Sequence, residues 1–594
     1  MDPADALRRL FGFEHFRPGQ AEAVAAAMAD RDALVVMPTG SGKSLCYQLP
    51  ALMRDDLTLV VSPLVSLMQD QVSAVRAVAP GRVELVNAQR GGAANAEALA
   101  RVAAGEARLL YVAPERFASP RFAEAVARTR VGLFVVDEAH CISQWGHDFR
   151  PDYFFLADAA RRVGARATIG LTATATPAVA DDIARRLALR DPVRVTTGFD
   201  RPNLSFAVVR CGTAVDKRRR VAAALKENGA LPAIVYAGTR RASEELASFL
   251  SRALGEEVPA YHAGLRREVR AATQERLMAG EVRAIVATNA FGMGIDKADV
   301  RTVCHASVPG SLEAYYQEAG RAGRDGAPAR CLLFAEQRDK GLHVFFIQRS
   351  RLEAGVFERV AERLRWAGLD GRYDVPVDEL AADVGSSGDE ETIRAVIGHL
   401  TRAGLVTPQP APPDRAAGLI VGEWNVRILS ACLGSARDAE RARWSQYRSV
   451  WAYVERSGCR RAALLAHFGD RSSAVPSVAC CDVCSPSVAA SASPSAGASP
   501  VIAAEEGARA AGGLDAAILD VVVSAAPPVG RTRAVEILRG GRSKVIVQHA
   551  YDRLAGYGAF AHLHSSEVLG RVDQLLEAGK LHSTGGRFPK LRAA

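Results

Sequence analysis

A glycine-rich segment near the N-terminus contains the residue types that bind phosphate. The segment PTGSGKS, residues 38–44, follows the apolar run Ala33 to Met37 and leads into a helix-like stretch. The backbone amides of such a loop, together with the N-terminus of the helix, cradle phosphate groups. We expect the lysine to reach the β and γ phosphates and the last serine to hold Mg²⁺. The predicted nucleotide contacts are Thr39, Gly40, Ser41, Gly42, Lys43 and Ser44.

An acidic pair further along the chain supports this interpretation. Met37 stands where the general phosphate-loop pattern has glycine, so a turn that only packs a helix on a sheet is the alternative. However, Asp137 and Glu138 follow the apolar run Gly132 to Val136. A carboxylate at the carboxyl end of a buried strand is placed to hold Mg²⁺ opposite the phosphate loop. We expect Asp137 to bind the metal and Glu138 to orient the attacking water.

Two arginines complete the residues that phosphoryl transfer requires. The transition state develops negative charge, which cations stabilise. Arg321 and Arg324, in the segment QEAGRAGRDG of residues 317–326, can supply those cations. The alternative for such a segment is a surface helix held by ion pairs. Because the phosphate loop and the acidic pair occur in the same chain, we favour the catalytic interpretation.

Short apolar runs rich in β-branched residues must position these groups. Up to about Phe334, each run is followed by Gly, Ser or Thr and then by a helix-like stretch, which is typical of parallel α/β units. We predict two open parallel sheets, in domains 1–200 and 201–340. The predicted strands are Ala33 to Met37, Thr58 to Ser62, Leu109 to Val112, Gly132 to Val136, Ala167 to Leu171, Ala233 to Tyr236, Ala284 to Thr288, Thr302 to Ala306 and Cys331 to Phe334.

Helical periodicity replaces this pattern in residues 341–458. Val377 to Val384, a Gly-Ser-Ser turn and Glu390 to Ala403 predict a helix-turn-helix, and Asp438 to Glu455 predicts a further helix. The segment is a helical insertion that is either a winged helix or a spacer. Because its acidic residues would repel phosphate, we favour a spacer or a protein contact. These acidic residues are Asp378, Glu379, Asp383, Asp389, Glu390 and Glu391.

Four cysteines follow the insertion in residues 459–484. Cys459 is separate in sequence, and Cys480, Cys481 and Cys484 lie close together. Four thiolates fit tetrahedral Zn²⁺, and the Cys-x-x-Cys spacing lets one turn bind through two sulfurs. We predict a structural zinc module. Buried free thiols and an iron–sulfur cluster are the alternatives.

The C-terminal part divides into a linker and a small domain. Ala, Ser, Pro and Gly dominate residues 485–513, which we predict to be a flexible linker. Residues 514–594 regain apolar periodicity and end in Lys580 to Leu591, where Thr584-Gly585-Gly586 could turn a short hairpin. We therefore predict a helical domain with a wing.

Composition bounds these interpretations. The chain has 594 residues, of which 48% are hydrophobic and 24% charged, as in ordinary globular proteins, so wholesale disorder and fibrous repeats are excluded. It contains 75 Lys and Arg against 66 Asp and Glu, a net charge of +9 that suits polyanion binding without proving it. No long apolar run or secretory signal occurs, and ten cysteines are too few for a disulfide scaffold. We expect a soluble, cytoplasmic protein.

The motifs, taken in order, resemble those of the RecQ family of superfamily 2 helicases. The likeness extends from Phe11 to about Phe334 and includes FRPGQ at 16–20, DEAH at 137–140, LTATAT at 171–176, FDRPNL at 199–204 and YHAGL at 261–265. The resemblance implies two RecA-like domains that clamp ATP. It also implies that the block with Arg17 and Gln20 binds the nucleotide, with Gln20 reading adenine, and that Arg324 is an arginine finger.

The resemblance also implies residues that couple ATP to DNA. Thr172 and Thr174 would link the nucleotide site to motion between the domains. Residues 141–151, CISQWGHDFRP, are similar to the aromatic-rich loop that senses single-stranded DNA in this family. Aromatic faces stack on bases and an arginine contacts phosphate or stacks. The coupling residues expected are His140, Trp145, Phe149, Arg150, Thr172 and Thr174.

Two C-terminal segments resemble further modules of the family. Residues 459–484 resemble its zinc-binding module, although Cys480 and Cys481 are adjacent where relatives separate the ligands, so His467 could replace one of them. Residues 535–558 are similar to the RQC winged helix, which grips duplex DNA. The resemblance makes Arg539, Arg542 and Lys544 candidate phosphate contacts.

These observations predict an ATP-dependent DNA helicase that requires Mg²⁺ and a structural Zn²⁺. Movement from 3′ to 5′ on single-stranded DNA, tailed or forked duplexes as substrates, and a role in repair, recombination or replication follow from the resemblance. One alternative is an RNA-remodelling ATPase, against which the aromatic-rich loop and the zinc module argue. Others are a translocase or annealing factor without strand separation, and a DNA-binding scaffold without catalysis.

Overall fold

The structure is a computed structural model of the chain. It describes residues 2–593 apart from 64, 88–89, 144–152, 292–296, 367, 369, 386–388, 410, 413, 473–474, 491–512, 542, 555, 561–562, 564 and 585–589. The chain divides into two compact units, Met1–Ser493 and Pro494–Ala594. Within the described residues, every helix is too short or too polar to cross a membrane.

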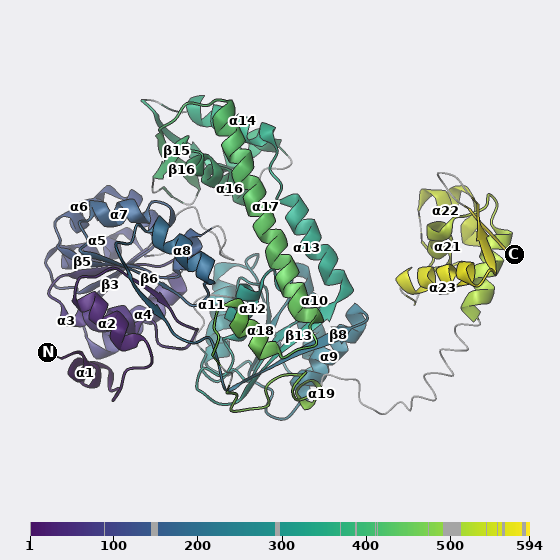
Figure 1. The fold of residues 1–594 in the computed structure, drawn as a ribbon, viewed down its shortest axis with the longest axis horizontal. Helices are drawn as coiled ribbons and strands as arrows, with labels where there is room; N and C mark the ends of the chain where they lie inside the picture. Colours follow the sequence, from purple (N-terminus) through teal and green to yellow (C-terminus); the bar gives the residue numbers. More distant parts are fainter. Residues whose placement is uncertain are drawn as a thin grey trace. The chain divides into compact units, whose positions relative to one another are not determined.

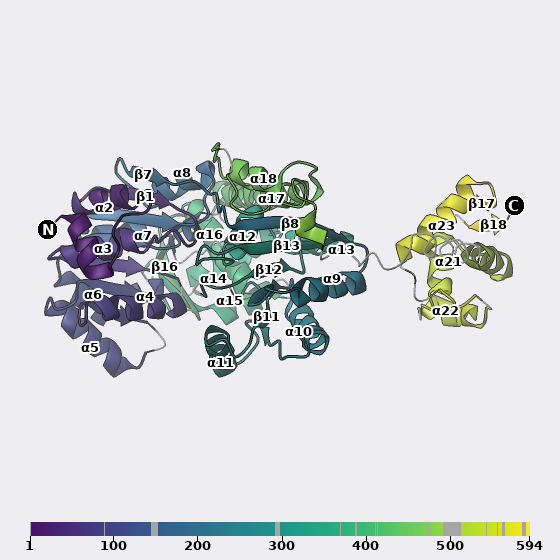
Figure 2. The same ribbon diagram turned by 90° about the horizontal axis from the view of Figure 1, so that it is seen from below.

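Seven parallel strands form the first sheet, in the order β3-β4-β2-β5-β6-β1-β7. The central strands are buried apolar runs because helices cover both faces (Figure 2). We call this part, residues 2–196, lobe 1. Its strands are β1 (Ala33–Val36), β2 (Leu57–Val61), β3 (Val83–Val86), β4 (Leu109–Val112), β5 (Val131–Val136), β6 (Ala167–Thr172) and β7 (Val193–Thr196).

The helices of lobe 1 form one layer on each face of the sheet. Helices α2 to α4 pack on one face, and α5 to α8 pack on the other. Because β1 and β5 both run parallel to β6, their carboxyl ends meet at one edge of the sheet. The helices are α1 (Pro3–Ala6), α2 (Gln20–Met28), α3 (Leu45–Met53), α4 (Val65–Val78), α5 (Gly92–Ala103), α6 (Pro120–Ala127), α7 (Leu156–Arg162) and α8 (Pro177–Arg186), with short turns η1 (Leu7–Phe11), η2 (Pro114–Ala118) and η3 (Ala139–Ile142).

Six parallel strands form the second sheet, in the order β10-β11-β9-β12-β13-β8. Helices α9 and α10 cover one face, and α12 covers the other together with two later helices, α17 and α18 (Figure 2). We call residues 204–336 lobe 2. Its elements are β8 (Leu204–Cys211), α9 (Ala214–Lys226), β9 (Ala233–Tyr236), α10 (Arg240–Leu254), β10 (Ala260–Tyr261), α11 (Arg267–Met278), β11 (Ala284–Ala287), β12 (Thr302–His305), α12 (Leu312–Ala319) and β13 (Ala329–Glu336).

Residues 354–420 fold as a winged helix with its own apolar core. Three helices alternate with a three-stranded antiparallel sheet of order β14-β16-β15. The helix-turn-helix is confirmed, and of the two folds left open the segment adopts the winged helix, with a core of its own. We call it the inserted winged helix. Its elements are α14 (Ala354–Trp366), β14 (Arg372–Pro376), α15 (Val377–Val384), α16 (Glu390–Arg402), β15 (Val406–Gln409) and β16 (Arg415–Ile420).

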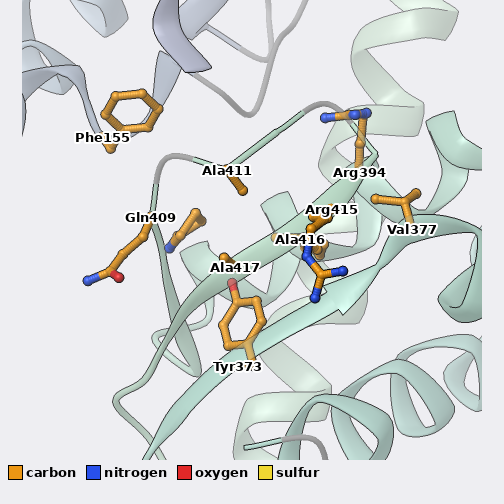
Figure 3. A pocket seen from close by; sticks show the side chains of 11 residues that line it. Phe155, Tyr373, Val377, Arg394, Gln409, Ala411, Arg415, Ala416 and Ala417 are labelled. Atoms are coloured by element: carbon orange, nitrogen blue, oxygen red, sulfur yellow. The ribbon is translucent and has the colours of Figure 1, made fainter. Parts of the chain in front are cut away.

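Two helices join the inserted winged helix to the rest of the unit. Helix α13 (Gln337–Arg349) leads into it, and the 30-residue helix α17 (Val426–Glu455) leads out beside α13 (Figure 1). The predicted helix thus begins at Val426 rather than Asp438. A cavity lies between the small sheet and Phe155 of lobe 1, with Tyr373, Gln409 and other side chains of the inserted winged helix on its opposite wall (Figure 3).

The C-terminal unit is a small helical domain with a two-stranded hairpin. Residues 513–524 are helical, and their side chains share a core with those of later helices and both strands. The predicted hairpin is present, with the Thr584 amide donating to the Lys590 carbonyl at 2.8 Å; Gly585 and Gly586 lie outside the described residues. Its elements are α21 (Arg531–Leu538), α22 (Lys544–Gln548), η6 (Tyr551–Arg553), α23 (Ser565–Glu577), β17 (Leu581–Ser583) and β18 (Leu591–Ala593).

Candidate nucleotide site and metal centre

The glycine-rich loop connects β1 to α3 at the carboxyl edge of the first sheet. Gly40 and Gly42 have φ angles of 84° and 81°, which side chains with a Cβ rarely adopt. The Lys43 ammonium donates to the carbonyls of Met37 and Pro38, at 3.1 and 3.3 Å, and so lies over its own loop. Burial lowers the pKa of Lys43, while the nearby carboxylates of Glu138 and Asp137 act in the opposite direction. The lysine and the acidic pair therefore share one site.

Arg17 and Gln20 hold this loop from the N-terminal side. The Gln20 side-chain amide donates to the carbonyls of Ser41 and Gly42, at 3.2 and 3.0 Å, and its oxygen accepts from the Arg17 amide at 2.8 Å. The Arg17 guanidinium donates to the Gly40 carbonyl at 2.7 Å. The two residues expected to bind the nucleotide thus lie directly against the phosphate loop.

Asp137 and Glu138 lie at the end of β5, beside two further residues named from the sequence. Glu138 has a left-handed φ of 49°, and its carboxylate lies 3.3 Å from Nδ1 of the buried His140. The same ring nitrogen lies 3.0 Å from the Thr172 hydroxyl, which accepts from the Thr174 amide at 3.2 Å. One continuous set of contacts therefore joins the acidic pair to the end of β6.

The electrostatics of the acidic pair favour a cation. Burial and the neighbouring Glu138 carboxylate together raise the pKa of Asp137 to about 7, while Lys43 acts in the opposite direction. Two carboxylates held this close to one another are stabilised by a divalent ion. The donor set of Asp137 and the Ser44 hydroxyl, all oxygen, fits Mg²⁺.

The arginine loop of lobe 2, residues 320–326, faces the phosphate loop. A cavity of about 300 Å³ opens between them, lined by Arg17, Thr39 and Gly40 on one side and by Gly323 and Arg324 on the other. Arg324 also acts electrostatically on Lys43, and Arg321 is 4% exposed. The structure thus brings Lys43 within electrostatic range of Asp137, Glu138 and Arg324, and of these four residues Arg324 lines the cavity.

Arg201 also lines this cavity, although sequence reasoning gave it no role. It lies in the connection between the two sheets, beside Asn203, whose side-chain amide donates to the carbonyls of Gly323 and Ala327 at 2.7 and 2.9 Å. The only signal in the sequence was the block FDRPNL, which marks a family without showing what its arginine contacts.

The four cysteines form one cluster. Their Sγ atoms all lie within 4.8 Å of one another, and Cys459 lies 3.6 Å from Cys480 and 3.9 Å from Cys481. Tetrahedral Zn–S bonds of about 2.3 Å place sulfurs about 3.8 Å apart, so the cluster fits Zn²⁺. The amides of Arg460 and Cys484 donate to Cys481 and hold its pKa below the ordinary value despite burial. His467 lies instead 2.7 Å from Glu313.

The segment around these cysteines packs on the connection between the lobes. Helix α18 (Arg460–His467) carries Arg461, which is 1% exposed and contacts the Asp200 carboxylate and the carbonyls of Arg201 and Leu204. The rings of Phe468 and Phe199 stack at 4.5 Å. Helix α18 and the nucleotide cavity therefore meet the same short connection, since Asp200 and Arg201 also line the cavity.

Several predicted residues lie outside the described part of the chain. Trp145, Phe149 and Arg150 belong to the segment 144–152, which the structure does not describe. Arg542 of the C-terminal domain also lies outside the described residues. Arg539 ends α21, and its Nε donates to the Leu563 carbonyl at 2.9 Å. Lys544 begins α22. The structure therefore gives Arg539 a contact within the C-terminal domain.

Two parallel-sheet lobes around a cavity with a phosphate loop and arginines define the architecture of a superfamily 2 helicase. Four family models match the chain: DEAD/DEAH box helicase at 17–183, helicase conserved C-terminal domain at 216–326, RecQ zinc-binding at 425–485 and RQC domain at 515–594. Together they cover both lobes, the cysteine cluster and the C-terminal domain. The inserted winged helix lies between the second and third matches.

Curated relatives identify the family. The chain is 38% identical over 359 residues to "Probable ATP-dependent DNA helicase RecS" of Bacillus subtilis (strain 168), covering 60% of this chain and 71% of the relative. It is 42% identical over 351 residues to "ATP-dependent DNA helicase RecQ" of the same organism, covering 58% of each. The chain therefore belongs to the RecQ family, and it spans somewhat more than half the length of that RecQ relative.

A solved structure is also similar. The "Mycobacterium smegmatis helicase Lhr bound to ssDNA and AMP-PNP" is 23% identical, with a TM-score of 0.48, over 73% of this chain and 63% of that one.

Proposed function

We propose that the protein is an ATP- and Mg²⁺-dependent DNA helicase that moves from 3′ to 5′ along single-stranded DNA and separates duplexes. The observation that carries the proposal is the cavity in which the phosphate loop faces the arginine loop. Relatives that the chain matches at 38–42% identity are called ATP-dependent DNA helicases. Tailed and forked duplexes are the substrates we propose, in repair, recombination or replication within the cytosol or nucleoid.

In this proposal the residues of lobe 1 bind MgATP. The amides of residues 39–44 and the Lys43 ammonium would hold the phosphates, and Ser44 and Asp137 would hold Mg²⁺, which would supply positive charge to them. Gln20 is proposed to read adenine, with Arg17 beside it. Glu138 orients the attacking water, because its carboxylate lies against His140 and its backbone amide donates to the Asp137 carboxylate.

Lobe 2 supplies the charge that the transition state needs. Arg324 approaches from the far side of the cavity, and Arg321 is buried in the same loop, so hydrolysis requires both lobes to be close. The contacts from Glu138 through His140 to Thr172 and Thr174 are suited to report the state of the nucleotide. Trp145, Phe149 and Arg150 follow His140 in sequence and are proposed to bind single-stranded DNA.

Zn²⁺ held by Cys459, Cys480, Cys481 and Cys484 would have a structural role, because four thiolates fill a tetrahedral site. We expect one zinc per chain in metal analysis of the purified protein. Alanine in place of Cys481, the buried member of the cluster, should release the metal and lower thermal stability. Absence of both zinc and iron at stoichiometric amounts would remove this part of the proposal.

The experiment that tests the motor is steady-state ATP hydrolysis with and without single-stranded DNA. The wild type should be strongly stimulated, Lys43→Ala should lose hydrolysis, and Trp145→Ala should keep nucleotide binding and lose most of the stimulation. Hydrolysis that is equal with RNA and DNA would favour the RNA-remodelling alternative. No hydrolysis by the wild type, with nucleotide bound, would favour a scaffold.

A further inference from the structure

Arg201 lies in the short connection between β7 and β8 and reaches both lobes. One guanidinium nitrogen, Nη1, donates to the Thr39 carbonyl of the phosphate loop and to the Gly320 carbonyl of the arginine loop, each at 3.1 Å. The other, Nη2, donates to the carbonyls of Ala322 and Gly323, at 2.9 and 3.0 Å. One side chain therefore holds together the two loops that must meet around the nucleotide.

The charge of Arg201 is also unusual. Burial lowers its pKa, and among the described residues no carboxylate lies within ion-pair distance, so carbonyl oxygens are its partners. Four carbonyl oxygens of the two loops, and no carboxylate among the described residues, therefore offset the burial of this cation. The side chain lines the same cavity as Arg17 and Arg324.

The arginine loop is shaped to accept these contacts. Gly323 has a φ of 53°, and a Cβ there would lie 2.5 Å from the Asn203 side-chain nitrogen and 2.7 Å from the Ala327 carbonyl. A Cβ on Gly40 would lie 3.8 Å from both Arg201 and Arg324. Gly323 thus has no room for a side chain beside Asn203 and Ala327, and Gly40 lies at ordinary contact distance from Arg201 and Arg324.

The backbone of Arg201 is itself held in place. Arg461 donates to its carbonyl at 2.8 Å, and the Phe199 amide before it donates to the Asp470 carboxylate at 2.7 Å. The Tyr316 hydroxyl donates to the Phe199 carbonyl at 2.6 Å. Because these contacts hold the backbone of the connection, the position from which the Arg201 side chain extends is fixed.

We propose that Arg201 is a positioning residue for ATP hydrolysis, which joins the phosphate loop to the arginine loop so that Arg324 reaches the transition state when the lobes close. The inference rests on the proposed ATPase function. Since the effect is exerted through Arg324, loss of Arg201 impairs the chemical step and leaves binding of the nucleotide to lobe 1 almost intact. Lysine cannot replace it, because a single ammonium cannot reach all four carbonyls.

The test compares Arg201→Gln and Arg201→Lys with a matched control, Arg210→Gln. Arg210 lies on β8 and is exposed, and its guanidinium contacts the Glu455 carbonyl at 3.3 Å, away from the cavity. DNA-stimulated kcat and KM for ATP, affinity for a fluorescent ADP analogue, and thermal melting are measured on the full chain. For Arg201→Gln we expect kcat to fall about 10- to 100-fold with the nucleotide affinity within about threefold.

The outcomes separate this inference from the proposed function. Arg201→Lys should also lose kcat, while Arg210→Gln should match the wild type. Equal kcat in Arg201→Gln and Arg210→Gln, with an active wild type, overturns the inference alone. A parallel loss of nucleotide affinity or of melting temperature overturns it as well, because Arg201 would then be a ground-state contact or a purely structural residue. An inactive wild type overturns both proposals.

Discussion

The chain contains two domains built from small helices and an antiparallel wing, and they differ in charge. Residues 351–425, around the inserted winged helix, contain thirteen acidic and eight basic side chains. Residues 513–594 contain seven acidic and eleven basic side chains. Since phosphate attracts basic surfaces, only the second has the charge of a DNA-binding domain.

The geometry of the inserted winged helix agrees with its charge. In a helix-turn-helix, the second helix enters the major groove with its N-terminal residues. Here that helix is α16, and it begins with exposed Asp389, Glu390 and Glu391. Its C-terminal half is buried against α17, where His399 lies 2.9 Å from the Ser435 hydroxyl. The comparison teaches that a winged-helix fold does not imply DNA binding, and that the charge on its second helix has to be examined.

Removing the basic domain should have the largest effect. A chain that ends at Ser493 keeps the first compact unit with both lobes and the cysteine cluster. We expect its affinity for duplex DNA at physiological salt to fall about tenfold or more, because the basic side chains of that domain no longer neutralise phosphates. ATPase activity stimulated by single-stranded DNA should remain within about twofold, since the residues of that site are unchanged. Fluorescence anisotropy with duplex and single-stranded probes measures the affinities, and steady-state hydrolysis measures the activity.

Unchanged duplex affinity in the truncated chain would break the comparison, since the basic domain would then contribute nothing to DNA binding.

A smaller, graded effect is expected from neutralising exposed charges. Replacing Lys580, Lys590 and Arg592 by alanine should weaken duplex binding and reduce the slope of log K against log salt by up to about 0.9 for each phosphate that is no longer neutralised. The matched control replaces Asp378, Glu379 and Glu391 by their amides. We expect little change in that control, because α15 and α16 do not approach the duplex. A strong gain of DNA affinity in the control would place the inserted winged helix beside DNA.

The change with the smallest expected effect on DNA binding is a pH dependence of stability confined to the inserted winged helix. Burial, with Arg402 and Arg443 nearby, lowers the pKa of His399 to about 3. In the unfolded chain the pKa of this histidine is about 6.5, so between about pH 6.5 and 3 the unfolded state binds more protons than the folded state. The stability of the inserted winged helix is therefore full above about pH 6.5 and falls as the pH is lowered towards about 3. Hydrogen exchange of the α16 amides should show a slope of up to about 1.4 kcal/mol per pH unit.

The C-terminal domain is the internal control for that experiment, since none of its described histidines is buried. His399→Gln should flatten the slope in α16. An equal slope in both domains, or one that persists in the variant, would show that other groups cause it.

The sequence predicted the catalytic residue types of the site better than the strands and helices that hold them in place. The apolar runs that became β1, β4, β6 and β9 were clear, because buried parallel strands are continuous β-branched segments. β3, β7, β8 and β10 were not predicted; β7 is a partly exposed edge strand and β10 has two residues, so neither gives a strong apolar signal. The start of α17 was placed twelve residues late, since Val426 to Arg437 carries a mixed pattern.

Long-range contacts are the part that one sequence could not predict. Lys43, Asp137, Glu138 and Arg324 were expected together because each has a motif and a chemical role. Arg201 was not expected there, because its role depends on backbone carbonyl groups of two loops. Every residue type has such a carbonyl, so the sequence does not mark these contacts. Likewise, the core that closes the inserted winged helix pairs β14 with β16, more than forty residues later in the chain.

The most direct test of the central claim is strand separation on matched duplexes that carry a 3′ or a 5′ single-stranded tail, with ATP and Mg²⁺. The wild type should unwind the 3′-tailed duplex only, and Lys43→Ala should unwind neither. Hydrolysis stimulated by DNA without strand separation on either substrate would contradict a helicase and indicate a translocase or annealing factor.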